Sequence, residues 1–272
     1  MTPTLFRAVV TDLDGTIVGD DGRLSDLTVA AAQELKRIDV PMIVATARTP
    51  FGITAIEHLP PLVAIAVCCT GAIGWSPTTS ANLWTHVLEI DTARRIAEIL
   101  ARFDRPGFAS FESHQWRMTA DYVGFRGASP RGPTEMVPLG AVVENAPCAL
   151  AACVPGLSAS HIAAELRDRG ISEAEATLTW AADELLDIVP PGVDKATGVD
   201  QALKILDIGW DSTITFGDMP NDLPMLRSSA VAVAAEEGHL DVKAAADLIA
   251  SKISEDGFAR TLGEIGVISK MP

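Results

Sequence analysis

Two carboxylates separated by a single residue follow an apolar segment near the N-terminus. Residues 8–10 (Ala-Val-Val) lead towards Asp12 and Asp14, and Gly15 and Thr16 come next. Carboxylates this close repel each other, so a site that holds both needs a compensating cation. Alone, the D-x-D-G pattern is weak evidence, because an Asp-Gly turn after a strand has the same sequence.

A calcium-binding loop of the EF-hand type also begins with D-x-D. It would require Gly where this chain has Ile17, and a bidentate Glu where it has Arg23. The sequence therefore excludes an EF-hand at this position.

A second acidic segment, GDMPNDLPM, follows the apolar run STITF. It contains Asp218, Asn221 and Asp222. If the two acidic segments end neighbouring strands, their carboxylates gather around a hard cation. Mg²⁺ takes oxygen ligands and often shares the phosphate oxygens of a substrate, so the combination indicates a magnesium site.

Two further residues lie at the boundaries of predicted strands and helices. Thr46 ends an apolar run and offers a hydroxyl and a backbone N–H to a phosphate oxygen. Lys195, at the predicted start of a helix, can neutralise both a phosphate and a nucleophilic carboxylate. Alone, Thr46 is an ordinary strand residue and Lys195 a surface charge. Together with the acidic segments, however, they follow in the order Asp, Thr, Lys, Asp-Asp, each at the boundary of an α/β unit.

The sequence predicts that a doubly wound parallel sheet positions these residues. Continuous apolar runs alternate with helical patterns, which is typical of strands buried on both faces. The runs are 8–11, VPMIVAT (40–46), LVAIAVCCT (62–70), STITF (212–216) and AVAVAA (230–235). The first is followed by an amphipathic helix, LTVAAAQELKRI, with Ser25 or Asp26 as its N-cap. The active site of such a sheet lies beyond the carboxyl ends of its strands, where these polar residues fall.

The middle of the chain has a different pattern. Residues 91–103 and 158–170 read as amphipathic helices, and residues 113–125 and 138–154 read as strand-like segments broken by Gly and Pro. The sequence thus predicts a catalytic core of residues 1–83 and 187–272, interrupted by an inserted α+β unit of residues 84–186.

Composition limits the partners. The 272 residues are 48% hydrophobic and 21% charged, with a net charge of -15. This charge argues against nucleic acid or an anionic membrane as a partner, because both attract cationic surfaces. A monomer or small homo-oligomer that binds a small molecule is expected.

The four cysteines, Cys68, Cys69, Cys148 and Cys153, show no C-x-x-C spacing. They are expected to be buried thiols rather than disulfides or zinc ligands. The N-terminal segment lacks the pattern of a signal peptide, and no apolar stretch is long enough to span a bilayer. A cytoplasmic location is the expectation.

At the level of motifs, the chain resembles the haloacid dehalogenase-like superfamily. DLDGT (12–16), ATAR (45–48), GVDKATGV and GDMPNDLPML match the four motifs of that superfamily, in order. Within it, the chain is similar to the Cof-like phosphatases, whose large α/β (type IIB) cap is inserted between the second and third motifs. The segment ADLIASKISEDGFARTL also resembles the family's C-terminal end. The resemblance implies a Rossmann-like core with an inserted cap domain.

The resemblance also implies roles for the motif residues. Asp12 would be the nucleophile, forming a transient aspartyl phosphate, and Asp14 the general acid and base. The implied cofactor is Mg²⁺, held by Asp12, Asp218 and the backbone carbonyl of Asp14, with Asp222 in a supporting position. Phosphate-binding groups would come from Thr46, Ala47, Arg48, Lys195 and Asn221.

The implied activity is hydrolysis of a small phosphorylated metabolite, a sugar phosphate or a similar compound. A phosphomutase or phosphotransferase of the same superfamily is the alternative, although these tend to carry bulkier residues than Gly15 in the first motif. A receiver-type signalling module would need about half this length. A non-catalytic phospho-ligand-binding protein would be expected to have lost Asp12 or Asp14, and both are present.

Substrate selection is expected from the inserted unit, acting as a mobile cap. Candidate contact residues are His114, Trp116, Arg117, Arg126 and Arg131. The chain departs from the usual family pattern at Ala47, where Gly is common, at Thr70, where Asn is common, and at Ala235-Glu236-Glu237, where Gly-Asn-Ala is common. These departures leave the substrate contacts open.

Overall fold

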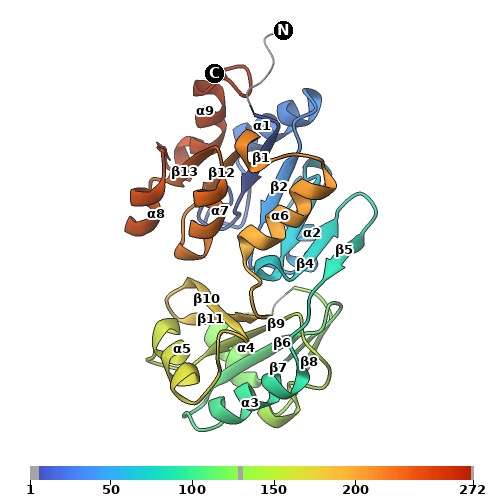
Figure 1. Ribbon diagram of the computed structural model, residues 1–272, viewed down its shortest axis with the longest axis vertical. Helices are drawn as coiled ribbons and strands as arrows, with labels where there is room; N and C mark the ends of the chain where they lie inside the picture. The colour runs from blue at the N-terminus through green and yellow to red at the C-terminus, as the bar shows by residue number, and fades with distance from the viewer. Residues whose placement is uncertain (1–5, 128–130, 271–272) are drawn as a thin grey trace. The chain divides into compact units, whose positions relative to one another are not determined.

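A computed structural model describes residues 6–127 and 131–270. The expectation that the N-terminal segment is no signal peptide concerns in part residues 1–5, which lie outside the described residues. The chain divides into two compact units (Figure 1). One combines the described residues up to Leu83 with those from Lys195 onward, and the other comprises Trp84–Asp194.

Within the described residues, the first unit forms an eight-stranded sheet in the order β14-β13-β12-β1-β2-β3-β4-β5. The strand bounds are β1 Ala8–Thr11, β2 Met42–Ala45, β3 Ile65–Cys68, β4 Ile73–Ser76, β5 Ala81–Thr85, β12 Thr213–Gly217, β13 Val231–Ala235 and β14 Leu248–Ala250. Pairing is parallel from β14 to β3 and antiparallel between β3 and β4.

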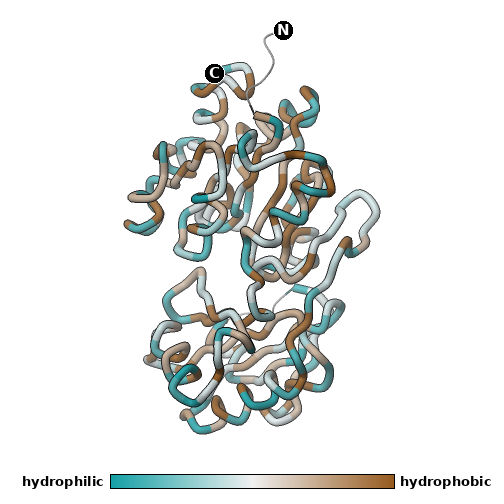
Figure 2. The backbone as a smooth tube through the Cα atoms, in the orientation of Figure 1, coloured by the Kyte–Doolittle hydropathy of each residue, from teal (hydrophilic) through white to brown (hydrophobic). Residues whose placement is uncertain are grey.

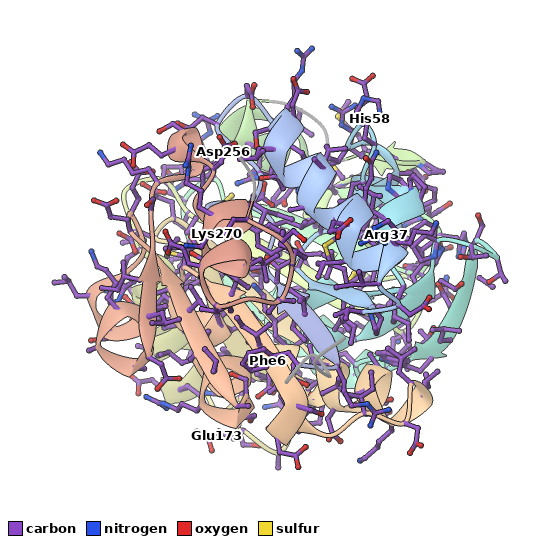
Figure 3. The ribbon with its side chains drawn as sticks, turned by 90° about the horizontal axis from the view of Figure 1, so that it is seen from above. Phe6, Arg37, His58, Glu173, Asp256 and Lys270 are labelled. Atoms are coloured by element: carbon purple, nitrogen blue, oxygen red, sulfur yellow. The ribbon has the colours of Figure 1, made fainter. Side chains whose placement is uncertain are left out.

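Helices cover both faces of this sheet. They are α1 Asp26–Arg37, α2 Pro50–Thr54, α6 Lys195–Ile205, α7 Leu223–Ser228, α8 Leu240–Ala245 and α9 Gly257–Glu264. Helices α1 and α9 contact each other on one face, and α6 and α7 contact each other on the opposite face (Figure 3, which labels Arg37 at the end of α1). Strands β1, β2 and β3 are entirely buried, as their continuous apolar sequences require. The predicted doubly wound parallel sheet is confirmed.

Helix α1 shows how residues at its ends determine where the helix begins and ends. Ser25 is the N-cap, and its hydroxyl accepts a hydrogen bond of 3.1 Å from the backbone N–H of Thr28. Asp26 lies in the first turn and Arg37 in the last, so both charges complement the helix dipole.

The second unit forms a six-stranded sheet, within the described residues, in the order β10-β11-β9-β6-β7-β8. Its strands are β6 Gly107–Phe111, β7 Trp116–Met118, β8 Thr134–Met136, β9 Ala149–Cys153, β10 Thr177–Ala182 and β11 Leu185–Val189. Its helices are α3 Ile90–Leu100, α4 Ala120–Arg126 and α5 Ala159–Asp168. The apolar faces of α3 and α5 pack with β6, β9 and β11 in one core, and the chain's apolar segments follow the strands (Figure 2).

Two features of this unit differ from the sequence-based expectation. Residues 113–125 were expected to be strand-like, but only Trp116–Met118 is a strand. Thr119 then caps α4, accepting a hydrogen bond from the backbone N–H of Tyr122. The second boundary falls at 194/195 rather than 186/187, because β11 pairs with β9 and β10 and stays with their sheet.

Short 3-10 helices complete the regular structure: η1 Pro60–Leu62, η2 Cys69–Gly71, η3 Leu139–Ala141, η4 Trp210–Ser212, η5 Pro220–Asp222 and η6 Ile253–Glu255. The four cysteines, all among the described residues, are buried and form no disulfide. In the part of the chain that the structure describes, no helix has the length and apolarity needed to cross a membrane.

Candidate active site

The two acidic segments follow neighbouring parallel strands. Thr11, the last residue of β1, is in register with Phe216 of β12, and the backbone N–H of Asp12 donates to the Phe216 carbonyl over 3.0 Å. The next turn of each segment therefore begins at the same sheet edge. Asp12 is 4% exposed and Asp218 is 7% exposed, so both carboxyl groups are held inside the protein.

Lys195, the first residue of α6, lies between two of the carboxylates. Its Nζ is 2.8 Å from Oδ1 of Asp12 and 2.6 Å from Oδ1 of Asp222. The lysine is 1% exposed. A fully buried ammonium is unfavourable unless it is paired, so these contacts explain how the chain tolerates it.

Burial and mutual repulsion shift the pKa values of these groups. Burial raises the pKa of Asp12 well above its ordinary value, and the nearby charges of Asp222 and Asp218 add to the effect. Burial, followed by the charge of Asp222, raises the pKa of Asp218 to about 6. Burial lowers the pKa of Lys195, but Asp12 and Asp222 outweigh it and the pKa lies above its ordinary value.

The same cluster fits a divalent cation. Carboxylate oxygens of Asp12, Asp218 and Asp222 all lie within 4.8 Å of one another. Three buried carboxylates face one buried ammonium, which leaves two negative charges to compensate within this cluster. Oxygen donors and a double charge are what Mg²⁺ requires, so the residues present fit the ion that the motifs imply.

Asp222 has both oxygens engaged by the protein. Oδ1 accepts from Lys195, and Oδ2 accepts from the backbone N–H groups of Asp218 and Met219, each over 3.0 Å. It therefore shapes the turn that carries Asp218, which suits a supporting position beside a metal.

Asp14 lies outside this carboxylate cluster. Its side chain is 56% exposed and forms a bidentate ion pair with Arg48, with 2.7 Å from Nε to Oδ2 and 2.5 Å from Nη2 to Oδ1. Arg48 was expected to bind phosphate, but in the structure its guanidinium is engaged by a carboxylate. Any contact of Asp14 with a metal is left to its backbone carbonyl.

Thr46 follows β2 at the same edge of the sheet and is 1% exposed. Its backbone N–H was expected to face a phosphate, but it donates to the Val67 carbonyl over 2.9 Å and so continues the pairing of β2 with β3. Its hydroxyl accepts from the backbone N–H of Arg48 over 3.1 Å and keeps its own proton for a ligand. Ala47, half-buried, can contribute only its backbone N–H.

Asn221 is 6% exposed, and neither its Oδ1 nor its Nδ2 has a hydrogen-bond partner among the described residues. Buried amides are nearly always hydrogen-bonded in folded proteins. An unpaired amide one residue from Asp222 is consistent with a group that meets a ligand.

Two residues of the first motif have structural roles that the motif alone does not indicate. The hydroxyl of Thr16 donates to Oδ1 of Asp218 over 2.9 Å, which joins the two acidic segments. Gly15 has a φ of 84°, and a Cβ at this position would lie 2.2 Å from Oδ2 of Asp218. The sequence signal for these roles was the Gly-Thr that ends DLDGT, because it follows the two carboxylates directly.

The candidate residues in the inserted unit are not equivalent. Arg117 is only 11% exposed, pairs with Glu135 and Glu144 at 2.6 Å each, and donates to the carbonyl of Ala141. Trp116 packs on Phe111, with ring centroids 5.0 Å apart. His114, Arg126 and Arg131 are exposed. The charge of Arg117 is thus compensated by two glutamates of the same unit.

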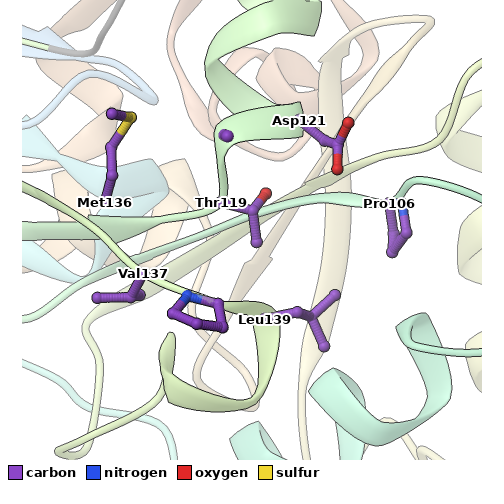
Figure 4. A pocket seen from close by; sticks show the side chains of 8 residues that line it. Pro106, Thr119, Asp121, Met136, Val137 and Leu139 are labelled. Atoms are coloured by element: carbon purple, nitrogen blue, oxygen red, sulfur yellow. The ribbon is translucent and has the colours of Figure 1, made fainter.

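The inserted unit also has an open pocket of about 410 Å³ (Figure 4). It is lined by Pro106, Thr119, Ala120, Asp121, Met136, Val137, Pro138 and Leu139. None of the five candidate contact residues lines it. Asp121 is paired with Arg105, and Thr119 is occupied in capping α4, so the pocket presents mainly apolar surface.

Comparison with known proteins places this arrangement in context. A family model for haloacid dehalogenase-like hydrolases matches residues 9–262. The chain is 21% identical over 260 residues to the 5-amino-6-(5-phospho-D-ribitylamino)uracil phosphatase YcsE of Bacillus subtilis (strain 168), covering 94% of each chain. It is 37% identical over 84 residues to the chloroplastic endoribonuclease YBEY of Arabidopsis thaliana, which is 31% of this chain but only 14% of that protein.

Solved structures show the same fold. The structure of a sugar phosphatase of subclass IIB matches with a TM-score of 0.81 at 20% identity, over 96% of this chain and 100% of that one. At this identity the likeness concerns the fold, including the inserted cap domain.

Proposed function

The chain belongs to the haloacid dehalogenase-like hydrolase family, and we propose that it is a Mg²⁺-dependent phosphatase of small phosphorylated metabolites. The observation that carries the proposal is the buried cluster in which Lys195 bridges Asp12 and Asp222 beside Asp218. A relative that matches over nearly the full length, YcsE of Bacillus subtilis, is a phosphatase of a small phosphorylated compound, which supports the substrate class and favours hydrolysis over phosphotransfer.

In this mechanism Asp12 is the nucleophile. Its carboxylate attacks phosphorus, the bond from phosphorus to the leaving oxygen breaks with its electron pair on that oxygen, and an aspartyl phosphate forms. Lys195 fixes Oδ1 of Asp12 and supplies positive charge next to the phosphoryl group. The Thr46 hydroxyl and the Asn221 amide orient phosphoryl oxygens.

Asp14 moves the protons. It donates one to the leaving oxygen in the first step and removes one from the hydrolytic water in the second, so the enzyme returns to its starting state and releases inorganic phosphate. Its exposed carboxyl group suits both tasks, because the leaving group departs and the water arrives from solvent.

Mg²⁺, when bound, compensates the charge of the carboxylates and of the transferred phosphoryl group. Asp12, Asp218 and the backbone carbonyl of Asp14 would hold it. Asp222 and Asn221 would support that set from the adjoining turn. Positioning and charge compensation are most of what phosphoryl transfer requires.

The test is release of inorganic phosphate from a panel of sugar phosphates, nucleotides and cofactor phosphates, in the presence of Mg²⁺. The wild-type protein should hydrolyse at least one class, and Asp12→Asn should lower its rate at least about a thousandfold while the fold is retained, because an amide cannot attack phosphorus. Near-wild-type hydrolysis by the folded Asp12→Asn protein would disprove the proposal.

A further inference from the structure

Gly52, in α2, lies directly beneath the stem of Arg48. A Cβ built on this glycine would be 2.9 Å from Cβ of Arg48 and 3.3 Å from its Cδ. Real Cβ contacts are longer, so any larger residue must displace the stem near its base rather than at its flexible end. The Gly52 carbonyl also accepts a hydrogen bond from Nη1 of Arg48 over 3.4 Å.

The backbone of Arg48 is fixed on two sides. Its N–H donates to the Thr46 hydroxyl over 3.1 Å, and its carbonyl accepts from the N–H of Cys69 over 2.9 Å. Because the backbone and the stem are both held, the direction of the guanidinium is fixed as well. It meets Asp14 with two nearly parallel hydrogen bonds, a geometry that sets the plane of the carboxylate as well as its position.

We propose that Arg48 and Gly52 are positioning residues for Asp14. Gly52 leaves the space in which the stem of Arg48 lies, and the guanidinium then orients an exposed carboxyl group that would otherwise sample several rotamers. This inference rests on the proposed function, in which Asp14 is the general acid and base. It assigns Arg48 to the proton-transfer group rather than to the phosphate.

Two observations favour this assignment over phosphate binding. Nε and Nη2 of Arg48 already contact Asp14, and Nη1 contacts the Gly52 carbonyl. These contacts use three of the five guanidinium N–H groups, so Arg48 could approach a phosphate only with the second N–H of Nη1 and of Nη2. The Thr46 hydroxyl, which only accepts a hydrogen bond, and the unpaired Asn221 amide are both buried and can meet the phosphoryl oxygens instead.

The consequence depends on the leaving group. When the bond to the leaving oxygen breaks, that oxygen needs a proton from Asp14 in proportion to its basicity. Phenyl phosphate has a more basic leaving group than 4-nitrophenyl phosphate, and the two are similar in size. A misplaced Asp14 should therefore slow transfer from phenyl phosphate to Asp12 far more than transfer from 4-nitrophenyl phosphate.

The experiment measures the first turnover, by rapid quench, in the presence of Mg²⁺. Variants Gly52→Ala and Arg48→Ala are compared with the wild type on both substrates, and inhibition by inorganic phosphate is measured for each. Gly124→Ala is the matched control, because Gly124 also lies in a helix but a Cβ there meets nothing within 4 Å.

Both test variants should lose at least about tenfold in first-turnover rate with phenyl phosphate, a part of the 10²–10⁴-fold that a general acid supplies. Loss with 4-nitrophenyl phosphate and the change in phosphate inhibition should be small. Gly124→Ala should match the wild type. Alanine is the better helix former, so Gly52→Ala is expected to fold, and circular dichroism verifies it.

Equal losses on the two substrates with weakened phosphate inhibition would overturn the inference, because Arg48 would then bind phosphate. Gly52→Ala that behaves like Gly124→Ala would overturn the part that concerns Gly52. Failure of the proposed function is a separate result: the wild type would then hydrolyse neither substrate, or Asp14→Asn would show no dependence on the leaving group.

Discussion

Asp12 and Asp14 are two residues apart, yet their environments differ completely. Asp12 is buried against Lys195, whereas Asp14 is exposed and paired with Arg48. The chain leaves β1 after Thr11 and turns sharply, with a φ of 84° at Gly15, so the carboxylate of Asp12 lies in the buried cluster while that of Asp14 faces solvent. This difference matches two roles, a fixed nucleophile and a proton carrier that must reach both the leaving group and water.

The exposed carboxylate gives the first prediction. Asp14→Asn should lower steady-state turnover by about 10²- to 10⁴-fold, because neither proton transfer has its carrier. With 4-nitrophenyl phosphate, which needs little protonation, the aspartyl phosphate should still form and then accumulate. Intact-protein mass spectrometry after acid quench measures it. Full turnover without accumulation would exclude Asp14 as the acid and base.

Asp218 gives a prediction on pH. Its pKa is raised from 3.8 to about 6 in the folded protein without metal, so folding favours the protonated form. A raised pKa contributes stability that is present below the unfolded value and lost as pH rises through the folded value. In excess chelator, this group should therefore lower the Tm between about pH 4 and pH 6.

Asp218→Asn should remove that part of the pH dependence, as measured by thermal unfolding in chelator. Added Mg²⁺ should raise the wild-type Tm more at about pH 7.5 than at about pH 5, because the ion competes with the proton for the carboxylate. An unchanged pH dependence in the variant would contradict the raised pKa of Asp218, and an equal effect of Mg²⁺ at both pH values would contradict the metal assignment.

At the scale of elements, the inserted unit uses its cationic residues for its own assembly. Arg117, on β7, pairs with Glu135 of β8 and with Glu144, and donates to the carbonyl of Ala141 at the end of η3. One side chain thus joins an edge strand and a loop to the sheet. A side chain committed to four hydrogen bonds with these three partners is poorly placed to select a substrate.

Arg117→Ala should therefore lower the free energy of unfolding by about 1–3 kcal/mol, since it removes several hydrogen bonds to charged and backbone groups. Arg126→Ala, at an exposed position, should stay within about 0.5 kcal/mol of the wild type. Urea unfolding followed by circular dichroism compares the two. If Arg117→Ala left the stability unchanged and altered the ranking of substrates, Arg117 would be a substrate-contact residue rather than a structural one.

At the scale of the whole molecule, the site depends on segments that are far apart in the chain. Asp12 follows β1, Asp218 follows β12, and Lys195 begins α6 immediately after the inserted unit. A cation held by Asp12 and Asp218 would stabilise the folded core by mass action, since no short unfolded segment carries both carboxylates.

Hydrogen exchange can resolve this effect along the chain. Mg²⁺ should slow amide exchange in residues 12–16 and 217–222, which carry the cluster, and leave strands β6 and β9 of the inserted unit unchanged. Asp218→Asn should abolish the protection. Protection of β9 equal to that of residues 12–16 would mean that the ion acts on the whole chain rather than at this site.

Much of the molecule could be predicted from local sequence. The strands that carry Asp12, Thr46 and Asp218 are continuous apolar runs, and the parallel sheet follows from their alternation with helices. The sequence also predicted that the two acidic segments, with Asp12 and Asp218, lie close together, because parallel strands present their carboxyl ends at one edge. These are consequences of backbone direction, which the order of elements determines.

The tertiary structure decided which atom meets which. The N–H of Thr46 is used by β3, the guanidinium of Arg48 by Asp14, and Arg117 by two glutamates. Residues 187–189 stay with the inserted sheet, and Thr70 adopts a left-handed φ of 54°, a conformation that Asn adopts more readily than a β-branched residue. Each outcome depends on register and on contacts between residues distant in sequence, whereas spacing along the chain specifies only the residues available at each strand end.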